Sequence, residues 1–330
     1  MTGTLRRRAF LGGALAATAL AGCSGAPRWE RSAVRRAARS RVAVLPAAEY
    51  DERLVEVVLR GVRLFALGVA GKTVVLKPNF VEFDPAGVIN THPALVAAAI
   101  EAFRREGARH VIVAEGPGHH RDTEHLLTAS GLYPVLRETR ARYVDLNSDD
   151  ARAVRASSHY TGLDHLYFPE TLLKADLLVS MPKLKTHHWA GVTLSMKNMF
   201  GCIPGSIYGF PKNVLHWAGI SESIVDINSS MPVRRFAIVD GIVGMEGNGP
   251  IQGEPRRCGV VVFGEDPVAV DATAARLMTI DPRQVSHLAE AGRFLGNLAE
   301  ERIEQIGEPL DALRQDFRVL PSFAHLKRFV

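Results

Sequence analysis

Short apolar runs alternate with amphipathic segments through the first half of this 330-residue chain. Four apolar runs predict strands, at residues 41–45, 73–76, 110–114 and 142–146. Helical spacing of apolar residues predicts a helix within 51–67, and the start signals Thr91 and Pro93 predict a second helix that runs to about residue 105. Such alternation with short connections is typical of a largely parallel sheet. The sequence therefore predicts an α/β fold: a mostly parallel sheet with helices on both faces and a ligand crevice at the C-terminal ends of the strands.

The remaining elements are predicted from the same patterns. Further strands are predicted at residues 166–168, 177–179, 236–239 and 259–263. Further helices are predicted at residues 123–129, 132–138, 213–227 and 285–307, and from Asp266 onward. Residues 244–250 carry three glycines and a proline, which predicts a glycine-rich loop.

An export signal is predicted at the N-terminus. Arg7-Arg8 followed by Phe10-Leu11 resembles the twin-arginine signal, and an apolar run follows at residues 11–20. Leu20-Ala21-Gly22-Cys23 resembles a lipobox, whose cysteine receives a lipid. We therefore expect export by the twin-arginine machinery and attachment through Cys23 to the periplasmic or extracytoplasmic face of a membrane. An uncleaved anchor is the alternative, although the run is shorter than the ~20 residues that span a bilayer.

These features divide the chain into four parts. Residues 1–23 are the predicted signal peptide, 24–41 a basic tether, 42–282 the α/β domain and 283–330 a C-terminal helical cover. Because the twin-arginine system moves folded proteins, often with a cofactor already inserted, the signal favours a bound cofactor.

The charge is unevenly distributed along the chain. Residues 1–41 hold nine of the 40 basic residues and one of the 35 acidic residues, which leaves 31 basic and 34 acidic residues for the rest. The net charge of +5 therefore belongs to the N-terminal segment. A nucleic-acid-binding domain needs a basic face, so this distribution argues against nucleic acid as a partner.

The side chains best suited to bind a ligand or catalyse a reaction are concentrated in residues 175–205. An apolar strand is followed by Lys183, Lys185 and His187, and a short helix is predicted around Lys197 and Asn198. Lysines suit an anionic ligand because each carries three mobile donors. The residues predicted to bind an anionic, nucleotide-like cofactor or a small anionic substrate are Lys77, Asn79, Lys183, Lys185, Asn198, Gly247 and Gly249.

Acid–base and metal roles are predicted for a second group. The predicted catalytic residues are His187, Lys197 and Glu246, and the predicted ligands of a divalent metal are Glu115, Asp240 and His187. Solvated lysines and a hydrogen-bonded structural histidine are the alternatives.

Three cysteines limit the redox chemistry. If Cys23 carries a lipid, Cys202 and Cys258 remain, and they either pair or are two small buried residues. Two cysteines cannot supply the four thiolates of an ordinary iron–sulfur cluster, so none is expected.

Seven motifs in order resemble a bacterial and archaeal family, domain of unknown function 362, over residues 42–282. They are KPNF (77–80), THP (91–93), EGPG (115–118), MPKLKTH (181–187), KNMFGCIPG (197–205), DGIVGMEGNGP (240–250) and DPVAVDA (266–272). Many members carry a ferredoxin-like cysteine cluster, which this chain lacks. A redox role inferred from those members is therefore in doubt for this chain.

A second resemblance concerns the central stretch alone. His187, Ala190-Gly191, Lys197 and Pro204-Gly205 resemble the core of lactate-racemase-like proteins. In that family a histidine and a lysine ten residues later serve a nickel-pincer nucleotide, which is attached to the lysine. The resemblance implies these roles for His187 and Lys197.

Three functions are consistent with these observations. The first is an exported enzyme of redox or isomerisation chemistry that binds an anionic cofactor or substrate. The second is a non-catalytic lipoprotein that binds a ligand or cofactor in the same crevice. The third is a nickel-pincer racemase-like enzyme.

Overall fold

The computed structural model describes residues 27–118 and 122–329, so the predicted signal peptide and Cys23 lie outside the described residues. Among those residues the main sheet has ten strands. Eight of them run in the order β12 (Ile303–Gly307), β1 (Ser40–Pro46), β11 (Gln252–Gly264), β10 (Arg235–Asn248), β7 (Leu177–Met181), β2 (Thr73–Pro78), β3 (His110–Glu115) and β4 (Arg142–Asp145). Two more, β8 (Lys183–His187) and β9 (Gly191–Thr193), branch from β10.

Most neighbouring strands are parallel, as the sequence predicts. Only β11 runs antiparallel to both of its neighbours, and β9 runs antiparallel to β8. A separate antiparallel hairpin consists of β5 (Ala151–Arg155) and β6 (His165–Pro169). The predicted α/β fold with a mostly parallel sheet is confirmed.

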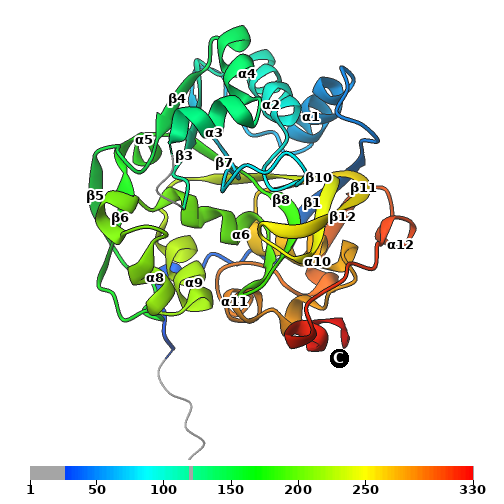
Figure 1. Ribbon diagram of the computed structural model, residues 1–330. Coiled ribbons are helices and arrows are strands. Elements are labelled where there is room, and N and C mark those ends of the chain that lie inside the picture. The colour runs from blue at the N-terminus through cyan, green and yellow to red at the C-terminus, as the bar shows by residue number, and fades with distance from the viewer. Residues whose placement is uncertain (1–26, 119–121, 330) are drawn as a thin grey trace, which may run out of the picture.

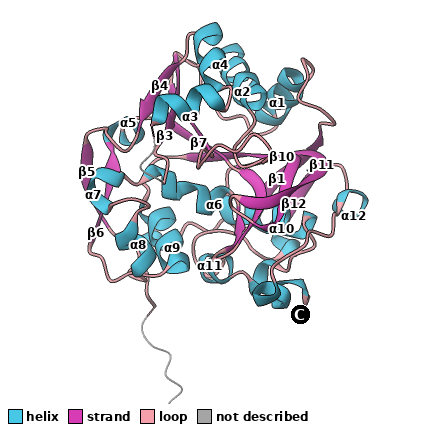
Figure 2. Ribbon diagram, viewed as in Figure 1, coloured by secondary structure: helices cyan, strands magenta, loops and turns pink. Residues whose placement is uncertain are grey.

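Helices cover both faces of the sheet (Figures 1 and 2). One face carries α1 (Leu54–Arg63), α2 (Pro93–Arg105), α3 (Thr123–Ala129) and α4 (Leu132–Thr139). The other carries α6 (Ser195–Asn198), α8 (Asn213–Trp217), α9 (Ile220–Ser230), α10 (Pro267–Leu277) and α11 (Ser286–Ala291). Shorter elements are α5 (Glu170–Leu173), α7 (Gly205–Tyr208), α12 (Leu310–Leu313) and 3₁₀ turns at 31–33, 199–202, 282–284, 300–302 and 321–327.

The two-sided cover explains why the strands are continuous apolar runs. In β2, Val74 and Leu76 belong to the apolar cluster that contains Phe103 of α2. Val75, between them, belongs to the cluster on the opposite face. Alternate residues of a strand point to opposite faces, so a sheet buried on both sides needs apolar residues at every position.

The predicted glycine-rich loop at 244–250 is wrong, because β10 continues through Asn248 and pairs with β11 to its end. The glycines instead allow neighbouring strands to approach closely. A Cβ on Gly244 would lie 2.6 Å from the carbonyl oxygen of Leu184 in β8. The register shifts between Gly241 and Val243, an irregularity that the strand absorbs.

Three other predicted elements differ from the structure. Residues 183–187 form strand β8, paired with β10 and β9, where polar residues beyond a strand end were predicted. The predicted helix 213–227 is two helices, since Gly219 adopts φ 105° between α8 and α9. The stretch 285–307 is α-helical only at its start, and its end forms β12, which extends the sheet beside β1.

Two findings concern membranes and cysteines. Among the described residues, no helix has the length and hydrophobicity needed to cross a bilayer. Cys202 and Cys258 are free thiols; Cys202 is buried, and burial raises the pKa of its thiol to about 12.

Candidate functional site: a cavity with four lysines

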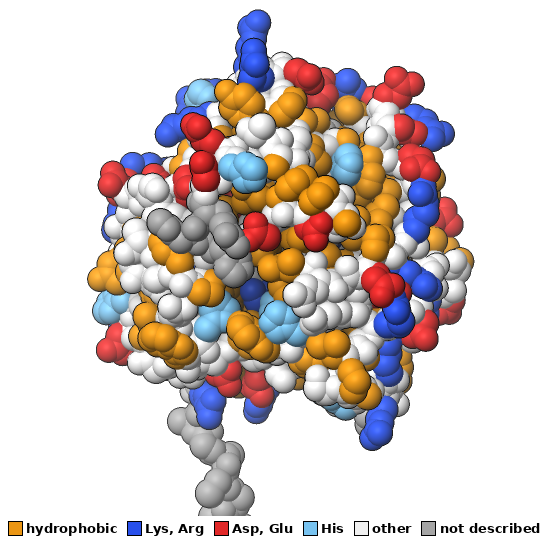
Figure 3. Space-filling view, viewed as in Figure 1, with side chains coloured by type: hydrophobic (Ala, Val, Ile, Leu, Met, Phe, Trp, Pro, Cys, Tyr) orange, Lys and Arg blue, Asp and Glu red, His pale blue; other side chains and the backbone are white. Residues whose placement is uncertain are grey.

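A cavity of about 250 Å³ lies beyond the C-terminal ends of β2 and β3, against β8 and α6. We call it the lysine cavity. Four lysines line it: Lys77, Lys185, Lys197 and Lys212. Glu115 is the one carboxylate among the described residues of its lining. Figure 3 shows a recess on this face of the molecule with a Lys or Arg side chain at its base and histidines at its sides.

The base of the lysine cavity is a buried ion pair. The Lys77 ammonium lies 2.8 Å from the Glu115 carboxylate, and both side chains are at most 2% exposed. Lys77 also donates to Asn198 Oδ1 at 2.9 Å, and Glu115 accepts the backbone N–H groups of Phe80 and Gly116, each at 2.9 Å. A buried pair is stable only when its remaining donors and acceptors are satisfied, as they are here.

Lys197 differs from the other lysines of the cavity because its ammonium group has no hydrogen bond to any described residue. It lies 4.3 Å from the ring centroid of Phe200, a cation–π contact. Burial, with the positive charge of Lys77 as the next cause, lowers the pKa of Lys197 to about 8, and Glu115 opposes the shift. About a tenth of this amine is therefore neutral at pH 7, far more than for a lysine with the ordinary pKa.

The other two lysines are held by oxygen atoms without charge. Lys185 donates to the carbonyl oxygens of Ile89 at 2.7 Å and Pro250 at 3.2 Å, and burial lowers its pKa well below the ordinary value. Lys212 contacts Asn147 Oδ1, and burial lowers its pKa to about 8. Neither ammonium has a carboxylate partner among the described residues, so an anion in the cavity would supply the missing charge.

His187 lines the lysine cavity as a neutral ring. Its Nδ1 accepts the backbone N–H groups of Trp189 at 3.0 Å and Ala190 at 3.2 Å. Burial, with Lys197 as the next cause, lowers the pKa of His187 well below its ordinary value. The single ring proton is therefore on Nε2, which makes this nitrogen a hydrogen-bond donor.

This tautomer bears on the metal roles predicted for His187. A histidine that binds a metal through Nε2 usually donates from Nδ1 to a carbonyl or carboxylate, whereas Nδ1 of His187 accepts. Among residues 27–118 and 122–329, no group of three or more His, Cys, Asp or Glu side chains is arranged to hold a metal ion. The residues present do not fit a nickel ion held by His187.

Two buried polar atoms in the lining lack a hydrogen-bond partner, Asn79 Oδ1 and Thr193 Oγ1. Unsatisfied buried polar atoms are rare in native proteins, and each costs about 1–3 kcal/mol. Their position beside the lysines indicates that a ligand with both donor and acceptor groups would satisfy them.

The short helix that carries Lys197 and Asn198 is fixed from behind by Asp271 of α10. The carboxylate accepts Ser195 N at 2.8 Å, Ser195 Oγ at 2.5 Å and Met196 N at 2.9 Å. These bonds satisfy N–H groups at the start of α6 that have no partner within the helix. Asp271 thereby positions the two cavity residues without touching the cavity.

The structure gathers most of the predicted residues and separates others. Seven lie in the lining: Lys77, Asn79, Glu115, Lys185, His187, Lys197 and Asn198. Lys183 and Asp240 do not; they form a separate buried pair at 2.7 Å, to which Tyr50 OH is hydrogen-bonded. The predicted single crevice is corrected in this respect: the metal-ligand set of Glu115, Asp240 and His187 does not meet in it.

Glu246 and its neighbouring glycines also lie outside the lining. The Glu246 carboxylate accepts the backbone N–H of Arg318 at 3.0 Å and its Nε–H at 2.9 Å. The N–H groups of Gly247 and Gly249 donate to the carbonyl oxygens of Arg318 and Gly247, so neither N–H faces a phosphate here. The sequence analysis missed Lys212 and Asn147, which lie in irregular segments without a motif.

A comparison with protein families shows to which family the chain belongs. A sequence profile described as domain of unknown function (DUF362) matches residues 74–276, more than half of the chain. The chain belongs to this family. The profile covers the strands, lysines and α6 segment that form the lysine cavity.

Individual relatives of this DUF362 protein are distant. The thylakoid-associated protein sll1697 of Synechocystis is 26% identical over an alignment of 259 residues, which covers 76% of each chain. The lactate racemase apoprotein of Thermoanaerobacterium thermosaccharolyticum is 13% identical with a TM-score of 0.49, over 76% of this chain and 58% of that one. A protein from Thermotoga maritima is 12% identical with a TM-score of 0.40, over 71% and 60%. The chain thus spans less than two thirds of either solved structure.

Proposed function

We propose that this protein is an exported enzyme that binds an anionic cofactor or substrate in the lysine cavity and catalyses redox or isomerisation chemistry. The observation that carries the proposal is Lys197: an enclosed amine with a pKa near 8 and no hydrogen-bond partner in the described protein, at the wall of a cavity. Lysines desolvated in this way serve as bases or as nucleophiles toward carbonyl groups.

The surrounding groups support binding and orientation of an anion. Lys212, whose pKa is about 8, supplies positive charge near neutral pH, and the Nε2–H of His187 supplies a directed donor. Phe80, Phe200 and Trp189 contribute apolar walls. A volume of about 250 Å³ suits a small molecule whose anionic end faces the lysines and whose apolar part contacts these rings.

Export and lipid attachment through Cys23 belong to the same proposal. They are supported by the arginine pair, the short apolar run and the cysteine at its end. A relative is described as thylakoid-associated, which is consistent with a protein that works at a membrane. The partners we propose are a small anionic molecule, the membrane and the twin-arginine machinery.

A non-catalytic ligand-binding lipoprotein is the second candidate, and one observation favours it. Glu115, the carboxylate in the described lining, is fully engaged by Lys77 and two backbone N–H groups. It is therefore not free to act as a general base. If the protein only binds its ligand, no chemical change in that ligand will accompany its release.

Native mass spectrometry of protein purified through its own export pathway tests the proposal. We expect an added organic mass that is lost, or weakened in occupancy at least tenfold, in Lys197→Met, because this change removes a charge that faces the ligand. Lys72→Met on the exposed surface is the control and should retain the mass. A mass equal to the bare chain, with no response to added sulfate, pyrophosphate or carboxylic acids, would reject the lysine cavity as an anion site.

The pH dependence of anion binding gives a second test. Lys197 and Lys212 each have a pKa near 8, so both are charged below that pH and lose charge as the pH rises through it. We expect sulfate, whose charge is constant over this range, to bind several-fold more weakly at about pH 9 than at about pH 7. Calorimetry across this range measures the change. A binding curve that stays flat until about pH 10, where ordinary lysines titrate, would contradict the assignment.

A further inference from the structure

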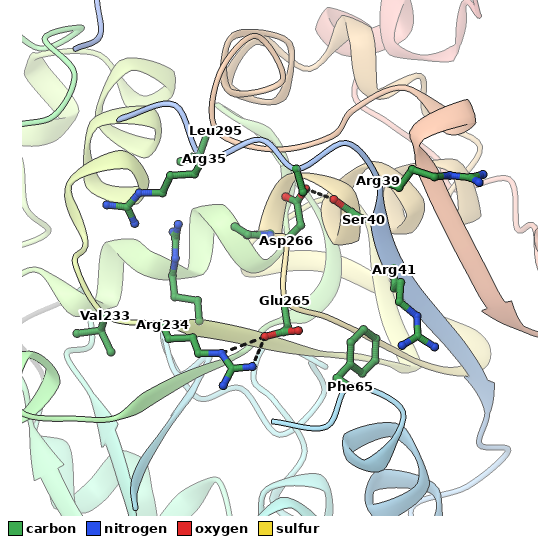
Figure 4. Close-up of a pocket in the computed structure, with 13 residues that line it drawn as sticks. Arg35, Arg39, Ser40, Arg41, Phe65, Val233, Arg234, Glu265, Asp266 and Leu295 are labelled. Atoms are coloured by element: carbon green, nitrogen blue, oxygen red, sulfur yellow. Dashed lines mark hydrogen bonds and ion pairs between the residues drawn. The ribbon is translucent and has the colours of Figure 1, made fainter. Parts of the chain in front are cut away.

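A second cavity, of about 430 Å³, lies at the opposite end of the strands from the lysine cavity, where β1 and β10 begin. We call it the arginine cavity. Five arginines line it: Arg35, Arg39, Arg41, Arg234 and Arg235. Two carboxylates, Glu265 and Asp266, stand against them. Figure 4 shows these two acids in the middle, with Arg35 and Arg234 on one side and Arg39 and Arg41 on the other.

Both carboxylates are already engaged. Glu265 Oε1 accepts from Arg234 Nη2 at 2.6 Å and Nε at 3.0 Å, a two-pronged contact visible in Figure 4. Asp266 accepts from Ser40 Oγ at 2.6 Å and Asn297 N at 2.8 Å, and it also caps α10. Each acid thus has hydrogen-bond donors of its own, and neither forms an ion pair with Arg35 or Arg235.

Arg35 and Arg235 are the pair left without an acid. Arg235 donates to Asn228 Oδ1 at 2.7 Å and Arg35 to the Met231 carbonyl at 3.1 Å, and neither forms an ion pair with a described carboxylate. Burial lowers the pKa of Arg235 to about 10, and the charge of Arg35 is the next cause. Both guanidinium groups line the same cavity, and the charge of Arg35 acts on Arg235 more strongly than the opposing charge of Asp266, so an anion held by both would be favourable.

We propose that the arginine cavity is a second binding site, distinct from the lysine cavity, for a phosphate group held by Arg35 and Arg235. Guanidinium groups bind phosphate oxygens through paired N–H donors, a geometry that lysine does not offer. Phe65, Val233 and Leu295 form an apolar wall beside the charges, which suits a phosphate ester with a hydrophobic part.

Two sources present this chemistry, a free phosphorylated metabolite and the headgroup of an anionic phospholipid. The lipid source agrees with the place of Arg35 in the chain, twelve residues after Cys23. Twelve extended residues reach at most about 42 Å, so a lipid on Cys23 would keep this part of the protein near the membrane surface.

Arginine-specific labelling separates the possibilities. The full-length chain, with Cys23→Ser to prevent lipid attachment, is treated with phenylglyoxal and mapped by mass spectrometry. One arm adds pyrophosphate, and two others add vesicles of phosphatidylglycerol or of phosphatidylcholine. We expect pyrophosphate or phosphatidylglycerol, but not phosphatidylcholine, to protect Arg35 and Arg235; protection by pyrophosphate indicates a free phosphate, and protection by the vesicles alone indicates a lipid.

Arg35→Gln and Arg36→Gln form a matched pair. Both residues are exposed and adjacent, and each donates to a backbone carbonyl, but only Arg35 lines the arginine cavity. Arg35→Gln should weaken binding of the protective ligand about tenfold, and Arg36→Gln less than twofold. Equal effects of the two changes, or no protection in any arm, would overturn the proposal. Repeating the labelling in Lys197→Met shows whether the arginine cavity acts independently of the lysine cavity.

Discussion

Replacement of Glu115 by alanine is expected to lower the free energy of unfolding by about 3–5 kcal/mol. The Glu115 carboxylate is buried and binds the Lys77 ammonium at 2.8 Å and the N–H groups of Phe80 and Gly116. Its removal leaves a buried charge supported only by Asn198 Oδ1 and the Pro78 carbonyl. It also leaves the N–H of Phe80 without a partner, whereas the N–H of Gly116 keeps the Gly201 carbonyl oxygen at 3.0 Å. Breaking a buried pair from one side is costly because the remaining charge stays desolvated.

Urea unfolding of the unchanged protein and of Glu115→Ala measures this loss. Glu101→Ala is the control: it removes an acid from an exposed ion pair with Arg105, and such pairs contribute only about 0–1 kcal/mol. Lys77→Met combined with Glu115→Leu should recover part of the loss, because no unpaired charge remains. If Glu115→Ala does not fold, Glu115→Gln is the alternative. It keeps the shape of the side chain and should still be less stable than the unchanged protein. A loss of less than about 1 kcal/mol in Glu115→Ala would mean that water reaches the pair.

The position of the lysine cavity was predictable from the sequence because it depends on topology. Lys77 and Glu115 end neighbouring strands, and residues at the C-terminal ends of parallel strands share one edge of the sheet. Asn198 joins them because α6 follows β7–β9 on the same edge. Each of these steps requires only that the strands be recognised and that the sheet be parallel.

The separation of Lys183 from Lys185 was not predictable in this way. Both residues are in β8, yet Lys183 binds Asp240 and Lys185 binds the Ile89 carbonyl. The pairing of β8 with β10 is irregular between Asp240 and Met245, so the two lysines meet different surroundings. A register irregularity of this kind leaves no signature in the spacing of two lysines.

The misplacement of Glu246 has a different cause. The glycines around Glu246 predicted a glycine-rich loop, whereas they allow a long strand to pass close to its neighbours. The carboxylate is then taken by Arg318, 72 residues further along the chain. Long-range partners of this kind depend on how the C-terminal segment packs, and no local pattern records it.

Lys197 should react with an anionic aldehyde faster than any ordinary surface lysine. At about pH 7.5, an amine with a pKa near 8 has about two orders of magnitude more neutral form than one with the ordinary value of 10.5. Pyridoxal 5′-phosphate is the probe: its phosphate suits the lysine cavity, and its aldehyde condenses with a neutral amine to an imine and water. Reduction with borohydride followed by peptide mapping identifies the lysine. We expect Lys197 to be labelled at least about tenfold faster than exposed Lys72, with a rate that rises with pH to a plateau above about 8.

Two variants separate reactivity from charge at this position. Lys197→Arg keeps a positive charge but has no nucleophilic amine, so it should retain sulfate binding and lose the label. Phe200→Leu removes the aromatic face 4.3 Å from the ammonium, which favours the charged form, and should shift the rate profile to lower pH. Labelling that spreads evenly over exposed lysines, or a rate that climbs without a plateau to about pH 10, would show that Lys197 is an ordinary lysine. The lysine cavity would then bind anions by charge alone, which is the behaviour expected of the non-catalytic lipoprotein.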